Sequence, residues 1–114
     1  MTLSAEHRLA TYGTLAPGQV NHHQLSGLDG HWLKGRVHGR LLTEGWGADH
    51  GCPGLILDQD GPAVGVQVFV SSDLPAHWER LDLFEGIEYQ RTEILVQTLQ
   101  GPIPAYIYAL AHKL

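Results

Sequence analysis

The segment 63–86 constrains the fold most, because the period of its apolar residues changes halfway along. Within 63–70, four valines fall on every second position: Val64, Val66, Val68 and Val70. This alternation predicts a strand with one face in the core. From Leu74 onward, apolar residues recur every three or four positions, which is typical of a helix with one buried stripe. A strand followed by an amphipathic helix predicts a protein in which a helix packs on a sheet.

The predicted helix, over about 71–84, ends next to a carboxylate that shares its apolar stripe. Counting about 100° per residue from Leu74, Glu85 lies on the same face as Trp78 and Leu81. Gly86 then ends the helix. Loss of water and the negative end of the helix dipole both favour the protonated form, so the pKa of Glu85 is expected to rise. Such a carboxyl group suits general acid/base catalysis; the alternative is a side chain that extends past the last turn into solvent.

The rest of the chain predicts mostly strands joined by turns. Expected strands cover 7–12, 55–58, 63–70, 89–99 and 103–110, with a short helix over 21–25. Segment 31–42 predicts a strand pair or one long bent strand, with glycines marking bulges. Because strands outnumber helices and no βαβ rhythm appears, the expected class is α+β: a small mixed, mostly antiparallel β-barrel with one main helix. The 114 residues fit a single domain, 1–114.

Charge and composition narrow the range of partners. The formal net charge of −5 opposes binding to a phosphate backbone, so nucleic acid is not expected as a partner. No apolar run approaches the length of a membrane span, and the N-terminus lacks the apolar core of a signal peptide; a soluble cytoplasmic protein is expected. Cys52 is the single cysteine, so no intramolecular disulfide is expected. Neighbours such as His22 and His23 point apart, so no metal site is expected.

A loop that contains glycine follows the first predicted strand. Its sequence is Tyr12-Gly13-Thr14-Leu15. Glycine allows backbone N–H groups to approach a ligand, and successive N–H groups form a nest for a carboxylate or a hole for a developing oxyanion. A plain β-turn is the alternative for this short motif.

Three further side chains are candidates for the same site. Tyr89 and Tyr106 are placed to present phenolic hydroxyls to a pocket, with core packing as the alternative. A tight pair between Arg91 and Glu85 would lower the pKa of Glu85 and oppose an acid/base role. We expect Arg91 to pair with Asp82 instead.

The motifs occur in an order that resembles the γ-glutamylcyclotransferase-like family. In sequence they are Tyr12-Gly13-Thr14-Leu15 with Pro17-Gly18, Pro53-Gly54-Leu55, Leu81-Asp82-Leu83-Phe84-Glu85-Gly86, Tyr89-Gln90-Arg91 and Ala105-Tyr106-Ile107-Tyr108. The resemblance is strongest to the short γ-glutamylamine cyclotransferase and bacterial branches and spans about Leu9 to Tyr108. Cys52, where members often have an aromatic residue, and the polar Thr11 depart from the pattern, so the substrate is the least defined property.

The resemblance implies a small mixed barrel whose Tyr12 to Leu15 loop lines a pocket, with Glu85 as the acid/base. It also implies a reaction without a cofactor. The α-amine of a γ-glutamyl amine or peptide attacks its own γ-carbonyl and releases 5-oxoproline and an amine or amino acid. Ring closure within one molecule benefits from a large effective molarity, so one carboxylate and one N–H loop suffice.

Three functions stay open on the sequence. The first is this enzyme, acting on a small γ-glutamyl substrate. The second is a non-catalytic module of the same fold that binds a small carboxylate, and the third is an amide hydrolase in which the same glutamate activates water. They differ in their products.

Overall fold

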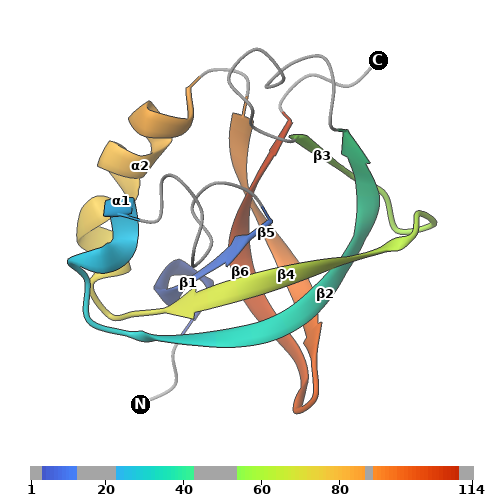
Figure 1. Ribbon diagram of the computed structural model, residues 1–114, viewed down its shortest axis with the longest axis horizontal. Coiled ribbons are helices and arrows are strands. Elements are labelled where there is room, and N and C mark those ends of the chain that lie inside the picture. Colours follow the sequence, from blue (N-terminus) through green and yellow to red (C-terminus); the bar gives the residue numbers. More distant parts are fainter. Residues whose placement is uncertain (1–3, 13–22, 43–53, 87–88, 111–114) are drawn as a thin grey trace.

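A computed structural model describes residues 4–12, 23–42, 54–86 and 89–110. Their elements, in chain order, are η1 (Ala5–His7), β1 (Arg8–Thr11), α1 (His23–Ser26), β2 (His31–Leu42), β3 (Gly54–Leu57), β4 (Ala63–Val70), η3 (Leu74–His77), α2 (Trp78–Glu85), β5 (Tyr89–Thr98) and β6 (Gly101–Leu110). Segment 31–42 is one long strand that curves along the side of the sheet (Figure 1). The prediction of a single bent strand is therefore confirmed.

The sheet closes into a barrel of five strands. The strand order is β2-β4-β1-β6-β5, and β5 returns to β2 through the pair Arg36 and Gln97. β3 pairs with the second half of β2 and extends the sheet beside the barrel. β1 and β6 run parallel, whereas the other pairs are antiparallel. The expected mixed, mostly antiparallel barrel with one main helix is confirmed.

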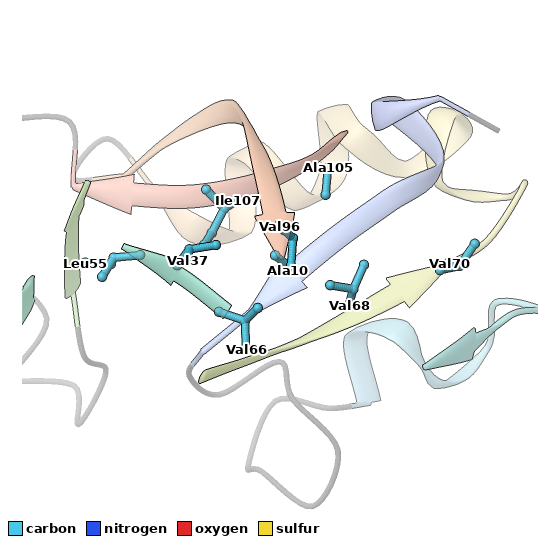
Figure 2. Close-up of a cluster of buried hydrophobic side chains, with 9 residues drawn as sticks. All are labelled: Ala10, Val37, Leu55, Val66, Val68, Val70, Val96, Ala105 and Ile107. Atoms are coloured by element: carbon cyan, nitrogen blue, oxygen red, sulfur yellow. The ribbon is translucent and has the colours of Figure 1, made fainter. Parts of the chain in front are cut away.

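Small apolar side chains fill the barrel interior. Figure 2 shows nine of them converging from five strands and from β3: Ala10, Val37, Leu55, Val66, Val68, Val70, Val96, Ala105 and Ile107. Three of the four alternating valines of β4 are in this group, and Val64 packs against it. The period-2 pattern thus predicted the core face of β4. Because this interior is packed with side chains, the ends of the barrel are where a ligand site is sought.

Glycines in β2 allow close approach of strands and do not mark bulges. β2 pairs with β4 in one uninterrupted register from His31 opposite Val70 to His38 opposite Ala63, and with β3 from Gly39 opposite Leu57 to Leu42 opposite Gly54. The bulges predicted at Gly35 and Gly39 are therefore wrong. A Cβ atom at Gly35 would lie 2.4 Å from Cγ1 of Val96 in β5. The missing side chain lets β5 cross β2 and close the barrel.

The helical segment packs on the outside of the barrel and has a break that the sequence did not predict. It begins as the 3₁₀ turn η3 and continues as α2. The predicted stripe is confirmed, because Leu74, Trp78 and Leu81 are all buried. They belong to a second apolar cluster between helix and barrel, whose buried members are Leu9, Leu25, Phe69, Leu74, Trp78, Leu81 and Tyr108.

One end of the barrel gathers several chain segments. α2 ends there, β5 and β3 begin there, and β6 ends there, in the upper part of Figure 1. β1 also ends at this level, since the hydroxyl of Tyr12 reaches the carbonyl of Tyr108. In the part of the chain that the structure describes, no helix has the length and apolar character needed to cross a membrane.

Candidate active site

Glu85 is the last residue of α2 and lies one turn beyond the buried Leu81. Its side chain is partly buried, and burial raises its pKa from 4.5 to about 7. Within the described residues its carboxylate makes no hydrogen bond or ion pair that would favour the charged form. A carboxyl group with a pKa near 7 both accepts and donates a proton near neutral pH.

Asp82, one turn before Glu85, has a contrasting environment. The Arg91 guanidinium donates two hydrogen bonds to it, Nε to Oδ1 at 2.9 Å and Nη2 to Oδ2 at 3.2 Å. The Tyr108 hydroxyl donates a third to Oδ1 at 2.6 Å. Burial by itself raises the pKa of Asp82, but these hydrogen bonds and the charge of Arg91 outweigh it and hold the pKa below its usual value.

The two carboxyl groups therefore have pKa values displaced in opposite directions on one short helix. Asp82 stays ionised and pairs with Arg91, as we expected from the sequence. Arg91 directs its Nε and Nη2 donors at Asp82, and burial sets the raised pKa of Glu85. Pairs of titratable groups separated in this way mark candidate acid/base sites.

Two aromatic rings fix the Arg91 side chain. The guanidinium carbon lies 4.6 Å from the ring centre of Trp78 and 4.8 Å from that of Tyr106. The two rings meet edge to face, with centres 5.3 Å apart. The Tyr106 side chain thus extends from β6 to Trp78 of α2, and its ring packs against the Arg91 guanidinium. Tyr89, at the start of β5, is partly buried against the same cluster.

Tyr12 ties three strands together at the end of the barrel. Its hydroxyl donates to the carbonyl oxygen of Tyr108 at 2.5 Å and accepts the backbone N–H of Leu55 at 3.2 Å. These bonds fix the residue from which the predicted anion-binding loop starts. Gly13, Thr14 and Leu15 themselves lie outside the described residues.

Tyr108 is the residue of this region that the sequence analysis left without a role. It is 5% exposed and contacts both Asp82 and Tyr12. Tyr106 and Tyr108 share the face of β6 that meets α2, so strand alternation places both there. Only the register between β6 and α2 decides which hydroxyl reaches Asp82. Among the described residues, no group of three or more His, Cys, Asp or Glu side chains is placed to hold a metal ion.

The protein is a small closed mixed β-barrel with one helix packed on its side, and it carries a carboxyl group of raised pKa at the end of that helix. Residues 9–114 match the family described as Gamma-glutamyl cyclotransferase, AIG2-like, and the chain belongs to this family. The resemblance inferred from the motifs is thereby confirmed. A comparison with curated proteins gives no match.

Solved structures share the fold. An AIG2-like protein of Mus musculus has 28% identity and a TM-score of 0.69, with 95% of this chain and 79% of that one covered. YkqA of Bacillus subtilis has 25% identity and a TM-score of 0.70 over 94% of this chain, but this chain spans only 36% of YkqA. Allophanate hydrolase of Kluyveromyces lactis has 17% identity and a TM-score of 0.64, with 92% of this chain and 17% of the hydrolase covered. This last likeness concerns the fold alone.

Proposed function

We propose that the protein is a cyclotransferase that cleaves γ-glutamyl amines or peptides, with Glu85 as its acid/base and with 5-oxoproline and an amine or amino acid as products. The substrate is a small molecule, and no cofactor takes part. Family membership supports the reaction class. The observation that carries the assignment of Glu85 is its partly buried carboxyl group, with a pKa raised to about 7, at the end of α2.

The proposed reaction needs three proton movements, two of which pass through Glu85. Ionised Glu85 accepts a proton from the substrate α-ammonium, and the free amine attacks the γ-carbonyl carbon. A tetrahedral intermediate with an oxyanion forms. Protonated Glu85 then donates to the leaving nitrogen as the carbon–nitrogen bond breaks and the oxyanion becomes a carbonyl again, so Glu85 returns to its starting state. The new ring nitrogen still carries one proton too many, and this proton passes through solvent to the released amine, which leaves as an ammonium ion. Backbone N–H groups of Gly13, Thr14 or Leu15 are proposed to bind the substrate carboxylate or the oxyanion.

The aromatic residues of the site have different proposed roles. Tyr12 positions the start of the loop, since its hydroxyl already bonds to β3 and β6. Tyr89 and Tyr106 stay candidates for contact with the substrate. Tyr106 would act through its ring edge and hydroxyl, because one side of its ring holds Arg91. A cytoplasmic location stays a prediction from the sequence.

Glu85→Gln tests the assignment. The amide keeps the shape of the side chain and cannot carry the proton, so turnover is expected to fall at least about a hundredfold. The assay is release of 5-oxoproline from a panel of γ-glutamyl amines and peptides. Glu79→Gln, at an exposed position on the same helix, is the matched control and is expected to keep wild-type turnover. Near-normal turnover in Glu85→Gln would overturn the assignment.

The products separate the three candidate functions. In ¹⁸O-labelled water, cyclisation gives 5-oxoproline without solvent oxygen, because the attacking atom is the substrate's own nitrogen. Hydrolysis gives glutamate that carries solvent oxygen. A binding module gives neither product and is stabilised by the ligand through mass action. Labelled glutamate as the main initial product would contradict the cyclotransferase proposal even if Glu85 were essential.

A further inference from the structure

The last turn of α2 is held mainly by polar contacts. The buried residues of this eight-residue helix are Trp78 and Leu81, in its first half. Beyond them, Leu83 is 79% exposed and Phe84 is 39% exposed, so apolar packing does little to fix the end of the helix. The turn that carries Glu85 therefore depends on other contacts for its position.

Asp82 supplies those contacts. Its backbone carbonyl accepts the N–H of Gly86 at 3.2 Å, where Gly86 has a φ of 88° and ends the helix. Its carboxylate accepts the Tyr108 hydroxyl and the two Arg91 donors. Glu85 lies between Asp82 and Gly86 in the turn that this backbone hydrogen bond closes. Contacts that fix Asp82 therefore also fix the position of Glu85.

Tyr108 connects this turn to the other half of the site. Its hydroxyl bonds to Asp82, while its backbone carbonyl accepts the hydroxyl of Tyr12. One residue of β6 thus contacts both the last turn of α2 and Tyr12, the residue after β1. The geometry points to Tyr108 as a positioning residue, which acts through Asp82 to hold Glu85 in register with the Tyr12 end of the site. This inference rests on the proposed function.

The group formed by Asp82, Arg91 and Tyr108 adds little net charge beside Glu85. Arg91 balances the ionised Asp82, and Tyr108 is neutral because burial, and then Asp82, raise its pKa. The titratable and charged groups of the elements that pack about this part of the helix are, besides Glu85 itself, His77, Glu79, Arg80, Asp82, Tyr89, Arg91, Glu93, Tyr106 and Tyr108. Loss of the Tyr108 hydroxyl changes none of their charges. Its effect on Glu85 is therefore expected to come from position and hydration.

Tyr108→Phe is the test, because it removes the hydroxyl and keeps the ring and the backbone bond to Tyr12. The first readout is the pKa of Glu85, from ¹³C NMR titration of its carboxyl signal, assigned with Glu85→Gln. In wild type it is expected at about 7, and in Tyr108→Phe it moves toward 4.5, as the loosened turn lets water reach the carboxylate. The second readout is turnover, with kcat expected to fall about tenfold and KM to change less than about twofold.

Thr98→Val is the matched control. It removes a hydroxyl that donates to the Gly101 carbonyl at 2.7 Å, in the β5–β6 hairpin at the other end of the barrel. The control is expected to lower the melting temperature without moving the pKa of Glu85 or the kcat. If Tyr108 only stabilised the fold, Tyr108→Phe would likewise lower the melting temperature and leave the Glu85 pKa and kcat unchanged. If Tyr108→Phe does not fold, Asp82→Ala combined with Arg91→Gln removes the acceptor of the same bond and also the cation that could otherwise pair with Glu85.

The outcomes separate this inference from the proposed function. An unchanged Glu85 pKa in folded Tyr108→Phe overturns the positioning role, whether or not the enzyme turns over. If wild type releases no 5-oxoproline while the Glu85 pKa falls in Tyr108→Phe alone, the proposed function fails and the positioning of Glu85 stands. If wild type turns over and Tyr108→Phe matches it in kcat, the proposed function stands and the inference fails.

Discussion

Replacing Glu85 with glutamine is expected to stabilise the folded protein at neutral and alkaline pH. In the folded state the Glu85 pKa is about 7, above the ordinary value of 4.5, so the folded state holds this proton more tightly than the unfolded state. Stability therefore falls as the pH rises from about 4.5 through 7. The difference between the two pKa values corresponds to about 3 kcal/mol at pH 8. Glutamine carries no charge and avoids this cost.

Urea unfolding of wild type and Glu85→Gln at a series of pH values measures the effect. Titrations shared by the two proteins cancel in the difference between their free energies of unfolding. That difference is expected to be near zero at pH 4 and to grow to about 3 kcal/mol in favour of the variant by pH 8. Asp82→Asn is expected to do the opposite, because the pKa of Asp82 is lowered and its ionised form stabilises the fold. A Glu85→Gln difference that stays flat with pH would refute the reasoning.

Three other substitutions test separate features. Tyr12→Phe is expected to lower the free energy of unfolding by about 1–3 kcal/mol, because backbone groups of β3 and β6 lose their shared partner; an unchanged urea midpoint would contradict this. Gly35→Ala is expected to cost about 1–3 kcal/mol, because its Cβ would lie 2.4 Å from Val96, whereas Gly65→Ala, with nothing within 4 Å, serves as the control. Gly13→Val is expected to weaken substrate binding more than stability, measured as affinity of the folded variant, and equal affinity would mean that the loop is only a turn.

Segments with strong periodicity were predictable from the sequence. The expected strand 63–70 has the same bounds as β4, because its alternating valines leave one choice of face. The helical stripe from Leu74 to Leu81 is also correct in its buried positions. The expected pairing of Arg91 with Asp82 is also confirmed; it was preferred because a pair with Glu85 would lower the pKa of Glu85 and oppose an acid/base role.

Features set by contacts distant in sequence were not predictable. Gly35 was interpreted as a bulge because nothing in its neighbourhood announces that β5 crosses there. The division of the predicted helix into η3 and α2 was not predictable, because the apolar stripe from Leu74 to Trp78 continues across both elements. The role of Tyr108 was not predictable, because its hydrogen bond to Asp82 depends on how β6 lies against α2. Strand alternation alone does not distinguish Tyr108 from Tyr106.

The parallel pairing of β1 with β6 affects how the chain folds. Leu9 and Ala10 pair with Tyr106 and Ile107, so the two strands nearest the ends of the described chain are neighbours. Closing a loop of almost the whole chain has a high entropic cost before any contact offsets it, and folds rich in such contacts form slowly. Until β6 has been synthesised, β1 and β5 each present an open strand edge. A nascent chain lacking β6 is therefore expected to be prone to aggregation, and the barrel to form only once the last strand is available.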